Sequence, residues 1–511
     1  MSLYTPDRAR RSMIYTAAFR IISQGTTIIG YVVMVRGMSE LDFGVFHLLY
    51  AVIPLISAGA SLGLEQVLRR YQPEYLSHNR RSAAAWLVRF VGRTRFGTNL
   101  VVLGSIFASW HLITPFFKLE PYRGEFVIFS VLILLYFQFR VLEISLSSHM
   151  LHKYSIGMQA GVAIIKLIGY STFTLLDDLS LQNAIFSDTL AYGLAYTAMY
   201  VVHRRLCATG SPILSSPISK EERKRLFRYG LFYNFNDAGT LTLNAKIDNF
   251  YIAAILDPIA VAVYSFYLRL TEMVQHVLPI IMFANVARPV FFAIPQDQAA
   301  ERIPRYFTVL LNTSLVVQIP LAAFALSFHE EIVLFAFGGR YISYSWLLPL
   351  TMLFATFNTI STPVTLAAQY AEKAAVILIS KIFGIYNIIA LLILIPALGV
   401  YGAALASGSA SVFKNLYIWW HIRYIARWTN WNSLILASLG YWGIFYLSAF
   451  IIKFSADWPP LAILAAGGIL WAVFFLAFLR SQALCESDRN ILGGLMRGRE
   501  RRLLRRLGMV R

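Results

Sequence analysis

Long apolar segments recur along the chain from residue 12 to residue 479, and short polar segments separate them. A transmembrane helix needs about 20 predominantly apolar residues, and fourteen segments approach or exceed that length. The predicted spans cover residues 12–35, 43–64, 97–116, 126–148, 155–176, 184–202, 229–255, 259–285, 306–328, 344–368, 374–396, 400–421, 432–452 and 459–479. The pattern therefore predicts an all-α polytopic membrane protein with about 14 transmembrane helices.

Polar residues interrupt two of these segments. Asp188 lies within residues 184–202. Residues 229–255 carry polar positions near a helical period, namely Asn234, Asp237, Asn244 and Asp248. On one continuous helix these positions share a face, which is typical of a helix that lines a wet cavity. The alternative is a set of polar contacts between packed helices.

Loop charges predict the orientation of the spans, because Lys and Arg concentrate in cytoplasmic loops. With the N-terminus inside, 33 of the 45 Lys and Arg residues fall in cytoplasmic segments, five in outside loops and seven in the spans. If residues 229–255 did not cross the membrane, every later loop would change side and the asymmetry would vanish. Both termini are therefore predicted to be cytoplasmic.

The composition agrees with a membrane protein. The chain has 511 residues, of which 58% are hydrophobic and 14% charged, whereas soluble proteins are about 45–50% apolar and about 25% charged. The net charge is +19, and most of the Lys and Arg residues that produce it lie in the predicted cytoplasmic loops. The charge therefore reflects membrane topology and does not indicate nucleic-acid binding. The two cysteines, Cys207 and Cys485, lie in predicted cytoplasmic segments and predict neither a disulfide nor a structural zinc site.

Residues 480–511 are predicted to be a basic amphipathic cytoplasmic tail. Leu492, Met496, Leu503 and Leu507 can share one helical face, with arginines around it. Such a helix lies on an anionic membrane leaflet, so membrane lipids are a predicted partner. Docking to a partner enzyme is the alternative.

Seven cations fall inside the predicted spans. They are Arg20, Arg140, Lys166, Lys246, Arg269, Lys381 and Lys414. A cation at the bilayer centre costs about 2.5–3.5 kcal/mol, so these residues line a polar interior, pair with acids or extend to an interface. The spans carry fewer acids, which are Glu143, Asp188, Asp237, Asp248 and Glu272. The excess of positive charge predicts an anionic cargo.

Arg20 and Gln24 share a stripe in the first span, and Arg20 has no acid within one turn. This pattern favours a place in the cavity for both. Lys246 is two residues from Asp248, so the two side chains cannot pair on one helix. Asn234 and Asn244 are predicted to line the same cavity.

Two other cations can pair locally. Arg269 precedes Glu272 by three residues, and Arg140 precedes Glu143 by three, a spacing at which side chains meet on a helix. Arg269 is predicted to bind substrate or to be neutralised by Glu272. Together with Asp237 and Asp248, Glu143 and Glu272 are predicted to couple an ion or to pair with the cations.

A weak internal repeat relates two halves of the chain. Residues 166–170 read Lys-Leu-Ile-Gly-Tyr and residues 381–386 read Lys-Ile-Phe-Gly-Ile-Tyr, in the fifth and eleventh spans. Parallel repeats are typical of transporters, and Lys166 and Lys381 are predicted to bind substrate from equivalent places. Extension of the flexible lysine stem to the interface is the alternative.

No motif for chemistry is visible in the chain. His47, His276 and His329 show no metal spacing, and the sequence has no phosphate-binding loop and no nucleotide fingerprint. We therefore expect no enzyme activity, no cofactor and no metal. Coupling of transport to protons, sodium or the membrane potential stays open.

Three stretches resemble the polysaccharide transporter family of the MOP exporter superfamily, the Wzx-type flippases of lipid-linked oligosaccharides. Residues 39–70 contain an acidic-Phe-Gly opening of the second span, with a Gly-Leu near its end and arginines after it. Residues 246–270 resemble the family's Asp-containing end of the seventh span and Val-Tyr-Ser opening of the eighth. Arg288-Pro289-Val290-Phe291 follows the eighth span.

The resemblance, over about residues 10–425, implies two six-helix halves around a central cavity plus two C-terminal helices. The expected organisation is an N-terminal half (1–202), a cytoplasmic linker (203–228), a C-terminal half (229–421), two additional transmembrane helices (422–479) and the tail (480–511).

The resemblance also implies a flippase of the bacterial inner membrane. It would move an undecaprenyl-diphosphate-linked oligosaccharide outward by alternating access, for O-antigen, lipopolysaccharide or exopolysaccharide assembly. A polysaccharide polymerase or glycosyltransferases are the expected partners. Three alternatives stay open, namely a multidrug cation antiporter of the same superfamily, a membrane subunit of an export complex, and a membrane glycosyltransferase or ligase. The cationic spans disfavour the antiporter, and the short outside loops disfavour the enzyme.

The predicted topology can be tested with reporter fusions. A reporter fused after residue 215 should report the cytoplasm, and one fused after residue 257 should report the outside, because residues 229–255 cross the membrane. A cytoplasmic signal at residue 257 would show that this span does not exist.

Overall fold

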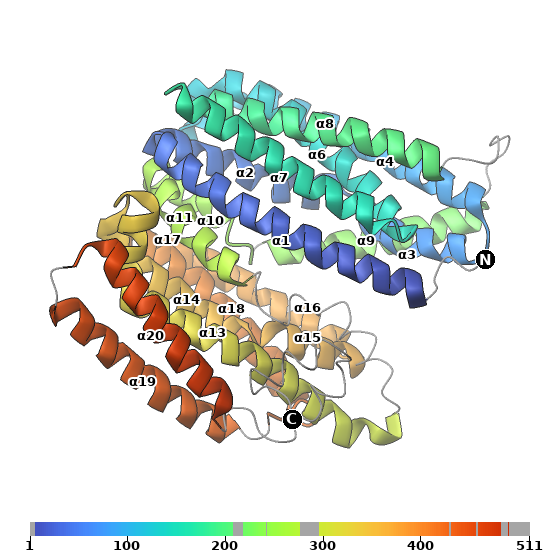
Figure 1. Ribbon diagram of the computed structural model, residues 1–511. Coiled ribbons are helices and arrows are strands. Elements are labelled where there is room, and N and C mark those ends of the chain that lie inside the picture. The colour runs from blue at the N-terminus through green and yellow to red at the C-terminus, as the bar shows by residue number, and fades with distance from the viewer. Residues whose placement is uncertain are drawn as a thin grey trace. The chain divides into compact units, whose positions relative to one another are not determined.

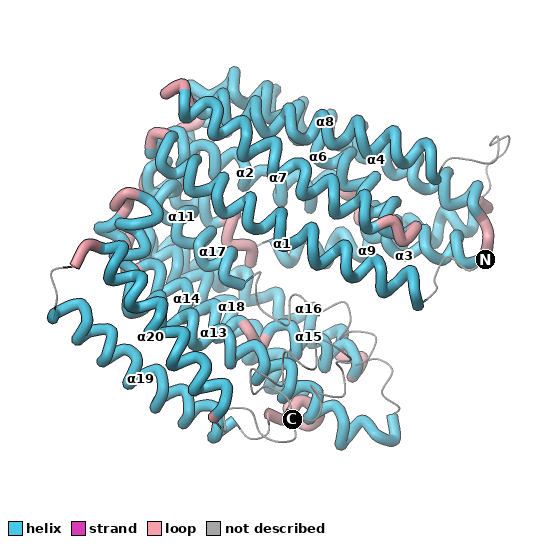
Figure 2. The backbone as a smooth tube through the Cα atoms, in the orientation of Figure 1, coloured by secondary structure: helices cyan, strands magenta, loops and turns pink. Residues whose placement is uncertain are grey.

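The computed structural model is helical throughout the residues that it describes, which are 6–207, 218–241, 243–275, 296–428, 431–455, 458–481 and 489 (Figure 1). Loops and turns between the helices are short, and no strand occurs in these residues (Figure 2). The predicted all-α polytopic fold is confirmed. Arg288-Pro289-Val290-Phe291, Cys485 and nearly all of the tail lie outside the described residues.

The chain forms two compact units, residues 1–262 and residues 263–511. Residues 229–262 belong to the first unit, although the sequence repeat assigns them to the C-terminal half. The functional halves defined by the repeat remain a prediction, and each unit is described separately below.

The N-terminal unit consists of helices that follow the predicted spans, with additional short elements. Its helices are α1 (Pro6–Gly37), α2 (Glu40–Ala60), α3 (Leu64–Ser77), α4 (Arg81–Ala108), α5 (Trp110–Phe117), α6 (Arg123–Ser148), α7 (His152–Leu175), α8 (Leu181–Cys207), α9 (Lys220–Leu241), α10 (Asp248–Ile255) and the beginning of α11 (Pro258–Gln275). Helices α1 and α7 lie side by side, as do α6 and α8 (Figure 1).

The C-terminal unit contains the rest of α11 and the later helices. These are α13 (Ala299–Phe337), α14 (Leu347–Asn358), α15 (Ser361–Tyr370), α16 (Ala374–Ile379), α17 (Phe383–Leu398), α18 (Val400–Ile422), α19 (Trp431–Ser455) and α20 (Pro460–Arg480). Short 3-10 turns occur at Gln296–Gln298, Ile342–Tyr344 and Ser380–Ile382 in this unit, and at Glu120–Tyr122 in the N-terminal unit.

A helix lies at each of the fourteen predicted spans. Within the described residues, nine helices are long and apolar enough to cross a membrane, and ten if α4 and α5, which bend by 77° at their junction, form one span. Helix α3 was not predicted, because its charges placed it in a loop. Its buried residues Leu64, Val67, Leu68 and Tyr71 repeat at helical spacing.

The seventh predicted span is broken. Helix α9 ends at Leu241 and α10 begins at Asp248, so the prediction of one continuous polar face was wrong. The Asn244 side-chain oxygen accepts the backbone N–H of Lys246 at 3.1 Å. Asparagine favours such local bonds over a helical ladder, which explains the turn between the two helices.

A second break separates α2 from α3 and brings α9 close. Gly63 has φ +66°, and a Cβ atom there would lie 1.9 Å from the carbonyl oxygen of Gly230 on α9. The Ser61 hydroxyl donates to the side-chain oxygen of Asn234 at 2.7 Å. The predicted cavity-lining residue Asn234 therefore joins α9 to this break.

The Phe-Gly motif at the beginning of α2 has a packing role. Phe43 is fully buried, and a Cβ atom at Gly44 would lie 1.8 Å from the carbonyl oxygen of Pro258. Only glycine allows the first turn of α11 to approach α2 so closely.

The core of the C-terminal unit surrounds a kink in α13. Phe328 has non-helical dihedral angles within α13, and its ring occupies the space that a Cβ atom of Gly467 on α20 would fill. Phe445 of α19 and Phe478 of α20 are fully buried in the same cluster. The two additional C-terminal helices therefore pack on α13 as part of this core.

Gly63→Ala tests the break between α2 and α3. The left-handed conformation costs a residue with a Cβ about 1–2 kcal/mol, and overpacking against Gly230 adds about 1–3 kcal/mol. We expect a lower unfolding midpoint in detergent and lower membrane abundance. The control is Gly161→Ala in α7, where an added Cβ meets nothing within 4 Å. Equal behaviour of the two variants would contradict the close approach.

Candidate functional site

The interior of the N-terminal unit contains a buried ion pair between α7 and α8. Lys166 Nζ donates to Asp188 Oδ2 at 2.7 Å and to the Tyr50 hydroxyl at 3.2 Å. The hydroxyls of Tyr50 and Tyr170 both donate to the Asp188 carboxylate. Asp188 is fully buried, so three donors from α2 and α7 compensate its lost hydration.

Aromatic rings also contact the Lys166 ammonium. Its Nζ lies 5.4 Å from the ring centroid of Tyr50 and 5.2 Å from that of Tyr192, within the range of cation–π attraction. The Lys166 side chain is 20% exposed. The predicted substrate-binding lysine is thus neutralised in this conformation, and Asp188 is its partner. Tyr170 and Asp188 are eighteen residues apart in the sequence, and this spacing gave no signal that the two side chains would be in contact.

A second ion pair lies on α6. Arg140 Nη1 donates to Glu143 Oε2 at 2.6 Å, and Gln159 of α7 donates to Glu143 Oε1 at 2.7 Å. The spacing of three residues is the one that suggested local pairing from sequence. Both carboxylate oxygens of Glu143 therefore have a donor.

A third ion pair was missed by the sequence reasoning. Arg95 of α4 is fully buried, and its Nη2 donates to Glu65 Oε1 of α3 at 3.3 Å. Its guanidinium lies 4.2 Å from the ring centroid of Phe137 on α6. Residues 65–96 lie between the second and third predicted spans, and their loop charges predict a cytoplasmic segment without a buried residue. The buried positions Leu87, Val88, Val91 and Asn99 share a helical period with Arg95, a signal that could have located it.

Two of the predicted substrate-binding cations remain without an ion pair. Arg20 of α1 and Lys246, in the turn before α10, are both exposed, and neither pairs with an acid among the described residues. Gln24, one turn after Arg20, is half-buried. Among the cations predicted from sequence to bind substrate, Arg20 and Lys246 are therefore the two in the N-terminal unit whose charge no acid neutralises in the described structure.

The predicted acids and amides of α9 and α10 lie in different environments. Asp248 is buried at the beginning of α10, and Asn244 is half-buried in the preceding turn. Asp237 belongs to α9, but its side chain is outside the described part of the structure. The side chains predicted for one helical face are therefore divided between a helix, a turn and a second helix.

In the C-terminal unit, Arg269 pairs with an acid on its own helix, whereas the neighbour identified for Lys381 is a second cation. Arg269 Nη1 donates to Glu272 Oε2 at 2.9 Å, with both side chains about one-third exposed. Lys381 lies in the 3-10 turn between α16 and α17, within electrostatic reach of Lys414 on α18. Lys166 lies in the continuous helix α7, so the two repeat-related lysines differ in backbone setting.

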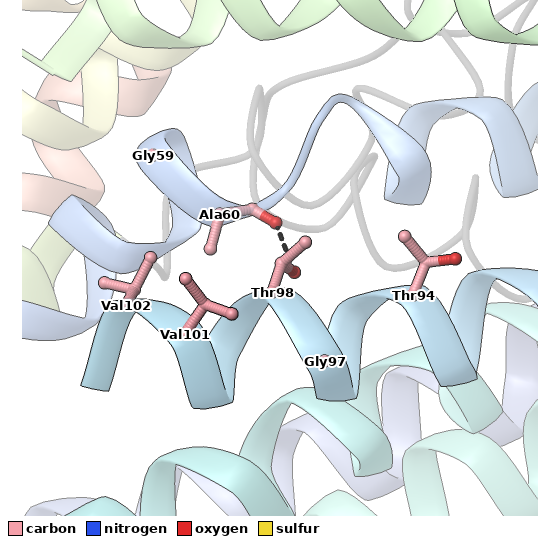
Figure 3. A pocket seen from close by; sticks show the side chains of 7 residues that line it. All are labelled: Gly59, Ala60, Thr94, Gly97, Thr98, Val101 and Val102. Carbon is pink, nitrogen blue, oxygen red and sulfur yellow. Dashed lines mark hydrogen bonds between the residues drawn. The ribbon is translucent and has the colours of Figure 1, made fainter. Parts of the chain in front are cut away.

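A surface hollow of about 500 Å³ lies between the end of α2 and α4. Its lining consists of Gly59, Ala60, Thr94, Gly97, Thr98, Val101 and Val102 (Figure 3). The Thr98 hydroxyl donates to the Ala60 carbonyl at 2.8 Å. None of the predicted site residues lines this hollow. Over the described ranges, no group of three or more His, Cys, Asp and Glu side chains is arranged to hold a metal ion.

Comparison with known proteins places these features in a family context. Residues 9–295, more than half of the chain, match the model of the family described as polysaccharide biosynthesis protein. The uncharacterized membrane protein MJ1068 of Methanocaldococcus jannaschii is 23% identical over 415 residues, which cover 76% of this chain and 79% of that protein.

Two solved structures share the fold. The lipid II flippase MurJ in an inward closed conformation aligns with a TM-score of 0.60 at 15% identity, over 91% of this chain and 99% of that chain. An inward-facing multidrug resistance MATE family transporter of the MOP superfamily aligns with a TM-score of 0.62 at 14% identity, over 81% of this chain and 98% of that chain. At these identities the likeness concerns the fold alone.

Removal of Asp188 tests the buried ion pair. Asp188→Ala leaves Lys166 buried among aromatic rings without its carboxylate, and breaking a buried pair costs about 3–5 kcal/mol. We expect a strong fall in the unfolding midpoint. The double variant Lys166→Met with Asp188→Leu should recover only part of it, because the hydroxyls of Tyr50 and Tyr170 still lose their acceptor. The control is Glu301→Ala, which breaks an exposed pair with Arg305 and should change stability by about 0–1 kcal/mol. Equal effects of Asp188→Ala and Glu301→Ala would contradict the role of the pair.

Proposed function

The chain belongs to the polysaccharide biosynthesis protein family, and on that premise we propose that it is a flippase that exports an anionic lipid-linked oligosaccharide. The family match supports a role in polysaccharide assembly. The fold is shared by a flippase and by a multidrug transporter, so it supports transport without selecting the cargo. The proposal of an anionic cargo rests on the positive side chains of the protein that have no acidic partner in the part of the chain that the structure describes.

The observation that carries the proposal is that two cations inside the predicted spans of the N-terminal unit have no acidic partner among the described residues. Arg20 and Lys246 are exposed and lack an acidic partner in the described structure. A diphosphate or an acidic sugar supplies the anion that would neutralise them, and Arg offers a bidentate fork for phosphate oxygens. A cationic drug would be repelled by the same groups, which makes the cation antiporter the weaker candidate.

The paired cations have a conditional role in this proposal. Lys166 and Arg269 each hold a carboxylate in this conformation, so they bind substrate only after the acid partner has moved. Lys381 is proposed to contribute to phosphate binding from the C-terminal unit. Alternating access provides the change of partner, because a transporter exists in at least two conformations.

The acids are proposed to couple transport to an energy source. Asp237, Asp248, Glu143 and Glu272 are the candidates for a proton or sodium ion, and the membrane potential acts directly on an anionic cargo. Outward movement of a negative headgroup in a bacterial inner membrane is favoured by a negative interior. No cofactor is required by this proposal.

A polysaccharide polymerase and glycosyltransferases are the proposed partners, since they would consume and supply a lipid-linked oligosaccharide. The inner membrane is the proposed location, with both termini in the cytoplasm, as the loop charges indicate.

Deletion of the gene tests the proposed function. Lipid-linked glycan should accumulate on the inner leaflet, and surface polysaccharide should fall, because the headgroup cannot cross unaided. Radiolabelled intermediates are followed with a membrane-impermeant probe of the outer leaflet. If the labelled intermediates reached the outer leaflet of the deletion strain at the wild-type rate, and the strain had no second flippase, the proposal would be overturned.

Substitution of the available cations tests the site. Arg20→Ala and Lys246→Ala should insert at near-normal abundance, since neither strands an acid, and both should lose transport. Arg20→Lys should retain part of the activity, because it keeps the charge and loses the fork. The control is Lys153→Ala, an exposed cation in the first turn of α7, which should transport normally. Wild-type transport by Arg20→Ala and Lys246→Ala would contradict the anionic-cargo argument.

A further inference from the structure

A cluster of charged side chains joins α3, α4 and α6 in the N-terminal unit. The members are three arginines and two glutamates, namely Arg69, Arg95, Arg140, Glu65 and Glu143. Their formal charges leave one positive charge in excess. We call this group the arginine cluster.

Arg95 is the incompletely satisfied member of the cluster. Its side chain is fully buried, and the single bond to Glu65 uses Nη2. Its Nε and Nη1 atoms have no hydrogen-bond partner in the described structure. Buried guanidinium donors are normally paired, because lost hydration is otherwise uncompensated. The unfilled donors of Arg95 therefore indicate a missing acceptor.

Arg140 and Arg69 make the cluster accessible from outside. The Arg140 side chain is 27% exposed although it holds Glu143. Arg69 is exposed on α3, one turn after Glu65, and lies within electrostatic reach of Arg140, Glu143 and Glu65. It forms no ion pair in the described residues. Glu143 therefore accepts from Arg140 and Gln159 and forms no ion pair with Arg69.

A tyrosine adds a neutral donor to the cluster. Tyr136 of α6 lies within electrostatic reach of Arg140, Glu65 and Glu143, and Arg95 lies within reach of Tyr136. The Tyr136 hydroxyl makes no hydrogen bond with the described residues. Arginine forks and a tyrosine hydroxyl are donors that suit the several oxygens of a phosphate group.

We propose that the arginine cluster binds a phosphate group carried by a membrane lipid, at the cytoplasmic end of the N-terminal unit. The predicted topology places α3 at that end, since residues 65–96 follow the second span on the inside. This site rests on the proposed function, in which the lipid is the substrate before its headgroup meets Arg20 and Lys246. The cluster then serves as the receiving site for the cargo.

The glutamates of the arginine cluster affect its affinity for phosphate, because they compete with the phosphate for the arginines. The Lys166–Asp188 pair is balanced in charge and fully bonded, and such a pair has no capacity left for an anion. In the arginine cluster, a bound phosphate competes with Glu143 for Arg140. Loss of a cation and loss of the competing acid should therefore change affinity in opposite directions.

The experiment uses the full-length protein in phosphatidylcholine nanodiscs and radiolabelled undecaprenyl diphosphate as the probe. Arg69→Gln should weaken binding about tenfold or more, the value of one charge-assisted hydrogen bond. Glu143→Gln should strengthen binding, and its amide oxygen still accepts from Gln159. The matched control is Arg70→Gln, which removes an exposed arginine that pairs with Glu74 at 3.0 Å on the same helix and should leave binding unchanged.

The unfolding midpoint of each variant separates binding from folding. Equal binding by the wild-type protein and Arg69→Gln would overturn the proposal, and so would equal losses in Arg69→Gln and Arg70→Gln. Phosphatidate and inorganic phosphate serve as competitors. Displacement by phosphatidate and not by millimolar inorganic phosphate supports a lipid-borne group, whereas displacement by inorganic phosphate alone overturns it.

The same variants distinguish this site from the proposed function. If the deletion strain exports glycan normally while the Arg69→Gln variant still binds undecaprenyl diphosphate more weakly than the wild type, the flippase proposal fails and the phosphate site stands. If the deletion blocks export while Arg69→Gln binds normally, the site fails and the flippase proposal stands.

Discussion

Compensation of charge inside the helical bundle is the constraint on which the rest of this structure depends. Removing an ion from water costs several kcal/mol even after relaxation, so a buried charge persists only with an opposite charge and further hydrogen bonds. The Asp188 carboxylate illustrates this with donors from Lys166, Tyr50 and Tyr170. Because these donors come from α2 and α7, one buried charge fixes the packing of three helices.

Close backbone contact is the second consequence of the same environment. Where a helix breaks inside a membrane protein, its free carbonyl and amide groups must be satisfied by neighbouring protein. At the break between α2 and α3, Gly63 removes the side chain that would separate it from Gly230, and Ser61 bonds to Asn234. Gly44 allows an equally close approach of Pro258. The Phe-Gly motif seen in the sequence is therefore a packing requirement.

The helical content and the span positions were predictable because apolar length and loop charge are local properties. Pairing across helices was not, since Lys166 and Asp188 are distant from each other along the chain and hydropathy carries no information on which faces meet. The local pairs Arg140–Glu143 and Arg269–Glu272 were foreseen, because three residues define a helical neighbour. Helix α3 and Arg95 were missed because high charge was interpreted as a loop, although the apolar period of α3 was present. The break at Asn244 was missed because a polar period was assumed to belong to one helix.

The distribution of cations separates folding from the proposed transport. A cation that holds a helix pair together, such as Lys166, cannot release its carboxylate without a cost to stability, so its use by a substrate must be linked to a change of conformation. A cation at an exposed position, such as Arg20 or Lys246, is hydrated when no substrate is bound. Binding of a substrate to it breaks no ion pair and therefore changes the stability of the fold little. Arg95 belongs to neither group, because it is buried yet has donors to spare. In the proposed transport, a bundle that stabilises itself with paired charges and offers unpaired ones at accessible positions would bind an anionic headgroup without weakening its fold.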